Sequence, residues 1–390
     1  MITVSEALDH LFALVSPLEP ETVPLAQAGG RVLVKPAVAR RDQPPFDGSA
    51  MDGYAVRDED ADPGASLTVI GEAAAGHRFG GSIGPGQTVR IFTGAPVPKG
   101  ASRVVIQEDV TRNGDQITLG SKLDAKTHIR PAGSDFKIGD SLDAPRRLSP
   151  SDVALLASMN IAQVEVTRKP RVALISTGDE LVMPGETPSP DQIIASNTFG
   201  LKALLDQLGA EPRVLPIARD TRSSLEMAFE LAEGADLVVT IGGASVGDHD
   251  LVGDVAQDLG MQQAFYKVAM RPGKPLMAGQ MGDAAMLGLP GNPVSAMVCG
   301  HVFMAPMIRV MLGLPACPAP RQTARLGCDM LKGGPREHYM RAALDDGEIV
   351  PEGRQDSSLL SLLAHADVLL VRPAEDPPRQ KGDQVEYIAL

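Results

Sequence analysis

The sequence predicts a multidomain α/β plus β protein, with an N-terminal helix, a β module, a central parallel-sheet domain and a small C-terminal β domain. A chain of 390 residues with 43% hydrophobic content can bury several cores. From Lys169 onward, apolar strands alternate with amphipathic helices, which is typical of a parallel sheet covered on both faces. Short β-type runs rich in Gly and Pro precede and follow that part.

The N-terminal half predicts two helices around a β module. The stretch "MITVSEALDHLFALV" has the capping-box pattern from Thr3 to Glu6 and carries acidic residues early, so we expect an amphipathic helix and no signal peptide. Residues 40–135 combine Gly and Pro with short strand signals, which predicts a small β module. Ser149 and Pro150 then predict the cap and first residue of a helix that leads into a strand.

The α/β part begins with the strand "PRVALISTG", and the helices "SNTFGLKALLDQLG" and "RSSLEMAFELAE" alternate with the strands "PRVLPIA" and "ADLVVTIGG". Ligands of such sheets bind at the carboxyl ends of the strands. The apolar stretch Val294–Leu314 contains His301, Pro306 and Arg309, so it suits a buried helix better than a membrane span. After about Pro315 the alternation stops, and "HADVLLVRP" and "DQVEYIAL" predict strands of a C-terminal β domain.

Composition excludes several classes of function. The chain has no Trp, four Tyr and a net charge of -13, which argues against a nucleic-acid partner. Its three cysteines form no CxxC pair, which argues against a disulfide framework or a structural zinc site and favours a reduced, cytoplasmic setting.

Two Gly-rich turns follow predicted buried strands. In "LGLPGNPVSAMV", Pro290, Gly291 and Asn292 precede an expected helix start, and Ser295 falls in its first turn. Backbone N–H groups there can hold an anion, although a purely geometric connection has about even odds when this turn is taken alone.

The second turn, "TIGGASVGDHD", follows the strand "ADLVVT". It predicts a phosphate nest made by four small residues, with acids beside it that can hold magnesium. These are Gly242, Gly243, Ser245 and Gly247, with Asp248 and Asp250 as the acids. The turn fits neither GxxxxGK[ST] nor GxGxxG, so an ordinary P-loop enzyme is excluded and a dinucleotide fold has weak support.

Charged residues near these turns have two interpretations each. Lys267, Arg271 and Lys274 can neutralise a phosphate or an oxyanion, or form a solvated face. Asp179 and Glu180, in "STGDEL", can bind a metal or substrate at the strand end, or cap the following turn. We favour the functional interpretation because several such turns converge on one edge of the sheet.

The motifs together resemble the molybdopterin molybdenumtransferase (MoeA) family, which is related to the gephyrin E domain. The resemblance covers nearly the whole chain. The matching stretches occur in the family's order and are "PPFDGSAMDGYAVR", "IFTGAPVPKGA", "RPAGSDFKIGD", "STGDEL", "GGASVGDHD", "MRPGKP" and "GLPGNPVSA".

The resemblance implies a four-part subunit in an elongated homodimer. The expected parts are a segmented dimerisation region at 1–40 and 136–168, a β module at 41–135, a MogA-like molybdopterin-binding α/β domain at 169–314 and a C-terminal β-barrel at 315–390. It also implies that adenylylated molybdopterin and molybdate react in the presence of Mg²⁺. AMP is released in this reaction, and molybdenum cofactor forms. In the family, the β module at each site comes from the other subunit. Molybdopterin adenylyltransferase and recipient molybdoenzymes are the implied protein partners, and no membrane is expected.

The resemblance also assigns roles to individual positions. The expected catalytic residues are Asp52, Asp135, Glu180, Asp250, Lys267 and Arg271, the last at a position that is often lysine. Asp248 and Asp250 are the expected magnesium ligands. Molybdate is expected at Lys274, Pro275 and Ser295, completed by Arg341 and by Ser357 or Ser358. The remaining expected substrate contacts are Thr93, Gly242, Gly243, Ser245, Gly247, Pro290, Gly291 and Asn292.

Some residues depart from the family pattern. Ala244 replaces the more frequent Val, and Asp367 stands at an Asn position. Asp356 adds an acid beside the expected molybdate serines, which an anion site disfavours unless a cation screens it. Two other functions remain open at this point, an adenylyltransferase-like enzyme and a non-enzymatic dimeric scaffold.

Overall fold

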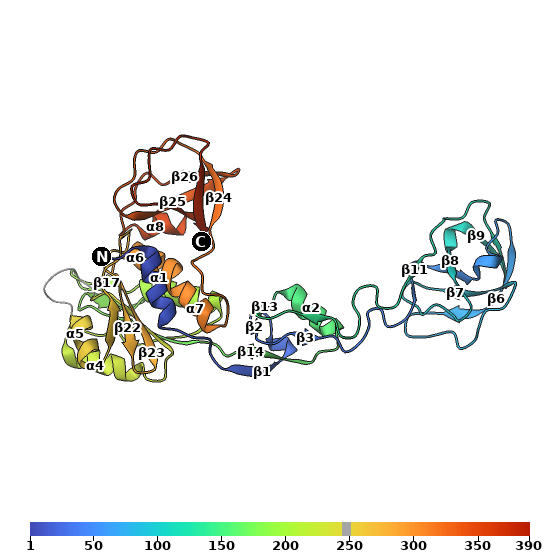
Figure 1. Cartoon of the computed structure of the whole chain (residues 1–390), viewed down its shortest axis with the longest axis horizontal. Coiled ribbons are helices and arrows are strands. Elements are labelled where there is room, and N and C mark those ends of the chain that lie inside the picture. Colours follow the sequence, from blue (N-terminus) through green and yellow to red (C-terminus); the bar gives the residue numbers. More distant parts are fainter. Residues whose placement is uncertain (244–250) are drawn as a thin grey trace. The chain divides into compact units, whose positions relative to one another are not determined.

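The computed structural model describes residues 1–243 and 251–390, which divide into two compact units. One unit comprises Met1–Glu21 and Val166–Leu390, and the other comprises Thr22–Glu165. Figure 1 labels the elements of both units along the chain.

The unit Thr22–Glu165 contains the expected mostly β structure. One sheet has the strand order β1-β14-β2-β13, and a second has the order β8-β5-β7-β6-β10-β9. The first sheet's strands are β1 (Pro20–Pro24), β14 (Gln163–Thr167), β2 (Val32–Leu33) and β13 (Arg146–Arg147). The second sheet's strands are β8 (Arg103–Ile106), β5 (Gly53–Val56), β7 (Gln87–Ile91), β6 (Ser66–Ala73), β10 (Gln116–Leu119) and β9 (Val110–Asn113). Apolar side chains on the two faces of the second sheet form separate clusters around Val89 and Ile117.

Both predicted helix caps are confirmed. In α1 (Val4–Ala13), Thr3 and Glu6 form the reciprocal capping box. In α2 (Pro150–Ser158), Ser149 caps the helix and Pro150 occupies its first turn. Each cap satisfies backbone N–H groups that have no partner within the helix.

The α/β part of the other unit is a mixed six-stranded sheet with the order β18-β15-β19-β23-β22-β20. Its strands are β18 (Glu211–Val214), β15 (Arg171–Ser176), β19 (Leu237–Ile241), β23 (Ala284–Leu289), β22 (Met277–Met281) and β20 (Gln262–Phe265). The first four strands are parallel, as predicted. Strand β22 pairs antiparallel with β23, because only two residues separate them and so short a connection permits only a hairpin. Strand β20 pairs antiparallel with β22.

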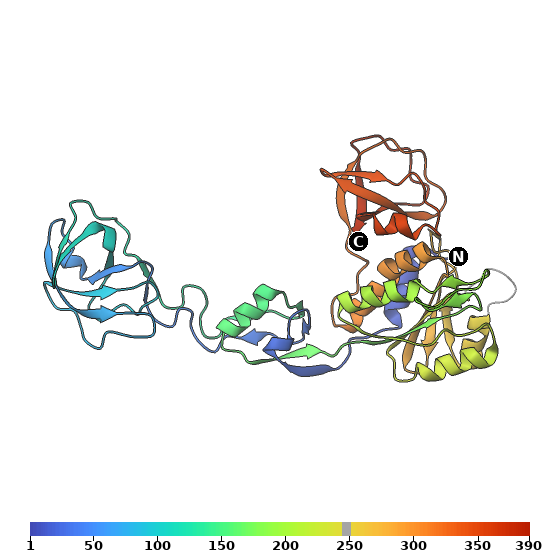
Figure 2. The ribbon, with the colours of Figure 1, turned by 180° about the vertical axis from the view of Figure 1, so that it is seen from behind.

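Helices cover both faces of this sheet (Figures 1 and 2). Helices α4 (Arg222–Leu231) and α5 (Leu251–Asp258) share an apolar core with one face of the strands. Helix α3 (Asn197–Leu208) contacts β15, and it packs against α6 (Pro293–Cys299) and α7 (Ala305–Met311). The N-terminal helix α1 lies against α7 and β20.

The apolar stretch in α6 and α7 is buried, as expected. A π-helical turn, η4 (Gly300–Met304), joins these two helices into a continuous helix, Pro293–Met311. This helix is long and apolar enough to cross a membrane, but 83% of its most apolar window is buried inside the protein. It is therefore a core helix of the α/β part.

The C-terminal part is a closed five-stranded β-barrel. The strands β25 (Glu337–Asp345), β26 (Glu348–Pro351), β24 (Gln322–Leu326), β28 (Gln384–Ala389) and β27 (Val368–Arg372) pair in that order, and β27 closes on β25. A short strand of the α/β part, β21 (Met270–Arg271), adds to β25 in parallel. This pairing connects the barrel to the segment that carries Lys274.

Candidate active site

A pocket of about 1020 Å³ opens at the carboxyl ends of the parallel strands β15, β19 and β23. Thr177, Gly242 and Pro290 each lie one residue beyond the end of one of these strands and line the pocket. This is the place where open α/β sheets bind ligands, because the turns after successive parallel strands meet there. The sequence-based prediction of turns converging on one edge is thus confirmed for these three turns.

The turn after β19 requires glycine at two positions. Gly242 has a φ of +95°, and an added Cβ atom would lie 2.8 Å from the carbonyl oxygen of Thr177. Gly243 has a φ of +69°, and its Cβ atom would overlap Val252. Only glycine adopts this backbone without strain, so the turn packs tightly against Thr177 and α5 at the pocket wall.

Among residues 1–243 and 251–390, two carboxylates line the pocket, those of Glu180 and Asp220. The segment that carries Glu180 is held by Arg219, whose Nη1 atom donates to the carbonyl oxygens of Asp179 (3.0 Å) and Leu181 (3.1 Å). The carboxylate of Asp179 accepts a hydrogen bond from the N–H of Asp220 (3.2 Å). Asp179 thus ties its segment to the residues before α4, whereas Glu180 belongs to the pocket.

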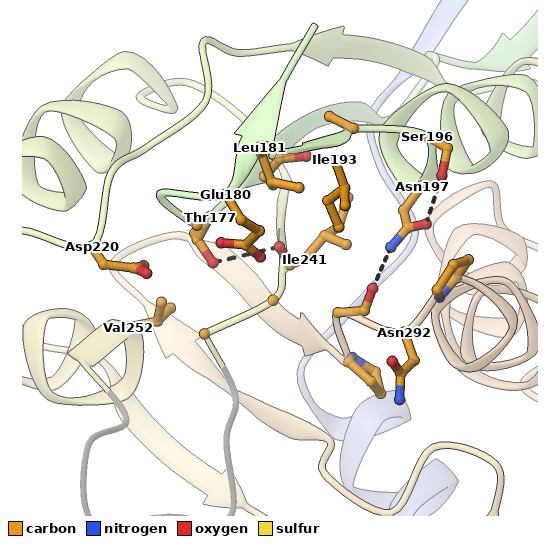
Figure 3. A pocket seen from close by; sticks show the side chains of 18 of the residues that line it. Thr177, Glu180, Leu181, Ile193, Ser196, Asn197, Asp220, Ile241, Val252 and Asn292 are labelled. Carbon is orange, nitrogen blue, oxygen red and sulfur yellow. Dashed lines mark hydrogen bonds between the residues drawn. The ribbon is translucent and has the colours of Figure 1, made fainter. Parts of the chain in front are cut away.

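The opposite wall of the pocket is built around the "PGNP" turn. Pro293 is the first residue of α6, as predicted, and Asn292 is its N-cap residue. Asn197, at the start of α3, donates from Nδ2 to the carbonyl oxygen of Gly291 (2.7 Å). Figure 3 shows Thr177, Glu180 and Asp220 toward one side of the pocket and Asn197 and Asn292 toward the other.

Apolar side chains line the pocket between these polar groups. Leu181, Ile193 and Ile241 lie between the two polar sides in the same view (Figure 3). Ile193 is 59% exposed and the neighbouring Ile194 is 40% exposed. A pocket with an apolar wall and polar groups at both sides suits a ligand that combines a ring system with phosphates.

The C-terminal barrel contributes Ser358 to the pocket. The neighbouring Ser357 is tied to the "PGNP" turn, because its hydroxyl accepts from Asn292 Nδ2 (3.2 Å) and its carbonyl oxygen accepts from Val294 N (3.1 Å). The barrel and the α/β part therefore meet at this edge of the pocket.

Other predicted oxyanion residues lie away from the pocket lining. Ser295 is 4% exposed and Arg341 is 2% exposed. Burial lowers the pKa of Arg341.

Lys267 and Lys274 both contribute backbone carbonyl oxygens to hydrogen bonds that hold their segment, accepting from Ile2 N and Val268 N respectively. Lys267 also places its Nζ atom 5.0 Å from the ring centre of Tyr266, and Arg271 lies opposite His338 across the β21–β25 pair.

Two predicted residues of the other unit contact one another. The Oδ1 atom of Asp52 accepts from Thr93 N (2.7 Å) and from Thr93 Oγ1 (2.8 Å). These two hydrogen bonds, with Arg90 nearby, lower the pKa of Asp52. Arg90 stacks on Tyr54 and Phe92 and donates to the carbonyl oxygen of Gly53 (3.1 Å).

Asp135 is exposed in a separate loop of this unit, and its N–H donates to the carbonyl oxygen of Gln43.

The predicted site residues therefore separate into four sets. Those that line the pocket are Glu180, Gly242, Gly243, Pro275, Pro290, Gly291, Asn292 and Ser358. Those in the same unit but outside the pocket lining are Lys267, Arg271, Lys274, Ser295, Arg341 and Ser357. Those in the other unit are Asp52, Thr93 and Asp135. Ser245, Gly247, Asp248 and Asp250 lie outside the described residues.

Among residues 1–243 and 251–390, no three His, Cys, Asp or Glu side chains form a metal-binding group. Glu180 and Asp220 nevertheless supply the type of oxygen ligand that Mg²⁺ uses. Since Mg²⁺ binds through one or two carboxylates together with substrate phosphates and water, these two residues fit a substrate-linked ion.

Family models match three parts of the chain. Residues 2–160 match the MoeA N-terminal region (domain I and II), residues 173–310 match a probable molybdopterin binding domain, and residues 323–390 match the MoeA C-terminal region (domain IV). A molybdopterin molybdenumtransferase from Nostoc sp. is 35% identical over 100% of this chain and 94% of its own length. The chain belongs to the molybdopterin molybdenumtransferase (MoeA) family.

Membership in this family makes the protein a transferase of molybdenum cofactor biosynthesis. A Haemophilus influenzae relative with the same name is also 35% identical, over 99% of this chain and 98% of its own length. The solved structure of the molybdopterin biosynthesis moeA protein from Pyrococcus horikoshii OT3 matches with a TM-score of 0.86 and 28% identity, over the whole of both chains. The MoeA architecture therefore extends over the full chain.

Sequence reasoning missed Asp220, Asn197 and Arg90. Asp220 follows the predicted strand "PRVLPIA", and the strand-end rule that selected Glu180 could have selected it as well. Asn197 lies at the start of the predicted helix "SNTFGLKALLDQLG", where a polar side chain indicates only a cap. Arg90 is a cation within a strand, and its position three residues before Thr93 was its only signal.

Proposed function

We propose that this MoeA-family transferase inserts molybdenum from molybdate into adenylylated molybdopterin, with Mg²⁺-dependent cleavage of the phosphoanhydride and release of AMP. One observation carries the proposal, namely the pocket of about 1020 Å³ at the carboxyl ends of β15, β19 and β23. It combines a glycine turn, two carboxylates, an apolar wall and a helix start within one cavity. An adenylylated pterin presents phosphates and ring systems to groups of these kinds.

The carboxylates have the chemistry that the cleavage needs. When water adds to phosphorus, the phosphoanhydride P–O bond breaks, AMP leaves with the bridging oxygen, and a proton of the water must be accepted. Glu180 and Asp220 can accept that proton or hold the water. A bound Mg²⁺ would neutralise charge that develops on the phosphate oxygens. We propose Asp248 and Asp250, from the sequence, as ligands of this Mg²⁺ ion, together with the pocket carboxylates Glu180 and Asp220.

The glycine turn and the "PGNP" turn would position the two anionic substrates. We assign the phosphates to the turn of Gly242 and Gly243, with Ser245 and Gly247, and molybdate to the region of Lys274, Pro275, Ser295 and the 357–358 serines. Ser358 and Pro275 both line the pocket, which supports placing the oxyanion near the edge contributed by the barrel.

The proposal includes the assembly and setting that the family resemblance implies. The subunit comprises the four parts already given, at 1–40 with 136–168, 41–135, 169–314 and 315–390, and forms a homodimer. Asp52, Thr93 and Asp135 of one subunit would complete the site of its partner. The enzyme would act in the cytoplasm, between a molybdopterin adenylyltransferase and recipient molybdoenzymes.

The test is AMP release from adenylylated molybdopterin with Mg²⁺, in the presence and absence of molybdate. We expect Glu180→Gln and Asp250→Ala to lower the rate at least about tenfold, and Ser295→Ala to shift the molybdate dependence. Glu230→Gln, at an exposed position on α4, is the matched control and should retain the wild-type rate. A folded wild type that binds the nucleotide but releases no AMP would reject the proposal and favour a scaffold role.

A further inference from the structure

The loop Arg354–Leu359, called here the 354–359 loop, forms the barrel's edge of the pocket through Ser358. It is fixed on two sides. Toward the α/β part, Ser357 contacts Asn292 and Val294. Toward the barrel, the loop wraps around the buried guanidinium of Arg341 on β25. A loop held from both sides keeps its side chains in a defined orientation relative to the pocket.

The Arg341 guanidinium directs its donors into this loop. Its Nη1 atom donates to the carbonyl oxygens of Asp356 (2.8 Å) and Leu359 (3.4 Å), and its Nη2 atom donates to that of Arg354 (3.2 Å). Its Nε and Nη2 atoms also donate to Gln355 Oε1, each at 3.3 Å. A guanidinium has five N–H groups, and these contacts use all five. Arg341 therefore shapes the loop and has no N–H left to donate to a ligand in this arrangement.

The Asp356 carboxylate takes the donors of the pocket residue Ser358. Its Oδ1 atom accepts from Ser358 N (2.8 Å) and from Ser358 Oγ (2.7 Å). A serine hydroxyl has one hydrogen to donate, so with that hydrogen on Asp356 it can only accept on its remaining side. These two hydrogen bonds, with Arg354 and Arg341 nearby, lower the pKa of Asp356, and the carboxylate is charged at neutral pH.

We propose that Asp356 weakens the binding of dianionic tetrahedral oxyanions at the barrel's edge of the pocket. It acts in two ways, by placing a negative charge beside the anion and by withholding the Ser358 hydroxyl. The inference rests on the proposed function, because it concerns the oxyanion that the pocket would receive. Asp356 acts on the ligand through the Ser358 hydroxyl and through its own charge.

The two effects are separable by substitution. Asp356→Asn removes the charge but leaves an oxygen that can still accept from Ser358, whereas Asp356→Ala removes both. Asp356 is exposed, so both variants should fold. Asp345→Asn is the matched control, because Asp345 is an exposed acid on the same barrel and does not line the pocket.

The experiment is calorimetric titration of the full-length protein with sodium molybdate, at low and at high ionic strength, with thermal unfolding of each variant recorded alongside. We expect Asp356→Asn to bind molybdate about five- to tenfold more tightly than wild type at low salt. That advantage should shrink at high salt, because the charge is exposed to solvent. Asp356→Ala should bind more tightly than Asp356→Asn, and adding Ser358→Ala to Asp356→Ala should remove that extra gain. Asp345→Asn should match wild type.

Wild-type or weaker binding by folded Asp356→Asn and Asp356→Ala would overturn the inference, as would undetectable binding by every variant. Neither result decides whether the protein releases AMP, which the AMP-release assay tests separately. If wild type releases AMP in a molybdate-dependent manner while the Asp356 variants bind no more tightly, only the role of Asp356 fails. If wild type releases no AMP while the variants show the expected order, only the proposed reaction fails.

Discussion

Asp52, a predicted catalytic residue, and Thr93, a predicted substrate contact, form a hydrogen-bonded pair. Two Thr93 donors converge on one carboxylate oxygen of Asp52. They stabilise the charged carboxylate, so the pKa of Asp52 lies below its ordinary value. The other carboxylate oxygen remains available to contact substrate or an ion.

We predict that Thr93→Val raises the pKa of Asp52 part of the way back to its ordinary value. The substitution removes the hydroxyl donor and leaves the backbone N–H in place. A carboxyl-carbon NMR titration measures the change. Thr111→Val, at an exposed position on β9, is the control and should leave the Asp52 titration unchanged. An unaltered Asp52 titration in Thr93→Val would contradict the pairing.

A comparison of Gly242, in the pocket turn, with Gly260 separates two effects of replacing a glycine, backbone strain and steric clash. Gly242 and Gly260 both have positive φ, at +95° and +96°, but only at Gly242 would a Cβ atom meet neighbouring atoms. We predict that Gly260→Ala costs about 1–2 kcal/mol of unfolding free energy through backbone strain alone. Gly242→Ala should cost more, because it adds the clash with Thr177. Denaturant unfolding measures both, and equal losses would contradict the tight packing of the turn.

The sequence predicted which positions form the pocket turns more reliably than it predicted which side chains are hydrogen-bonded to one another. The Gly and Pro positions of the two turns were predictable, because Gly242 and Gly243 need a positive φ and Pro293 suits the first position of a helix. The hydrogen bond from Thr93 to Asp52 spans 41 positions, and no periodicity in the sequence connects such distant side chains. The burial of Arg341 was likewise hidden, because arginine is seldom fully buried.

At the scale of elements, the pairing of β21 with β25 has a consequence for pH dependence. It sets His338 opposite Arg271. Burial, together with the nearby Arg271, Arg372, Arg336 and Arg341, lowers the pKa of His338 to about 4. The folded protein therefore favours the neutral imidazole.

We predict that His338 makes the protein less stable in acid. Because its folded pKa of about 4 lies below the ordinary 6.5, the unfolded chain binds more protons between these values. Its contribution to stability is complete above pH 6.5 and declines as the pH falls toward 4. His338→Gln should reduce the pH dependence of the unfolding free energy in that window, and His77→Gln, at an exposed position, should not. Equal slopes in wild type and His338→Gln would contradict the burial of a neutral imidazole.

Most elements followed from local signals, and the exceptions have a physical reason. The capping boxes of α1 and α2 need only residues three positions apart, so they were predictable. The antiparallel strands β22 and β20 were not, because short apolar runs do not reveal strand direction. The pairing of β21 with β25 joins segments 67 positions apart, and nothing local indicates it.

At the scale of the whole molecule, the proposed homodimer predicts complementation between subunits. If Asp52 of one subunit completes the site that contains Glu180 of its partner, Asp52→Asn and Glu180→Gln homodimers should both be inactive. Mixed and reassociated in equal amounts, half of the dimers combine the two variants, and each of these has one intact site. About a quarter of wild-type activity should therefore return. Confirmed mixed dimers without activity would rule out a site shared in this way.

The most direct test of the central claim is the amount of molybdenum incorporated per AMP released during a single turnover of the wild-type protein. The proposed reaction couples phosphoanhydride cleavage to metal insertion in one pocket. It therefore predicts one molybdenum in molybdenum cofactor for each AMP, and little AMP when molybdate is withheld. AMP released at the full rate without molybdate, or molybdenum inserted without AMP, would contradict the account.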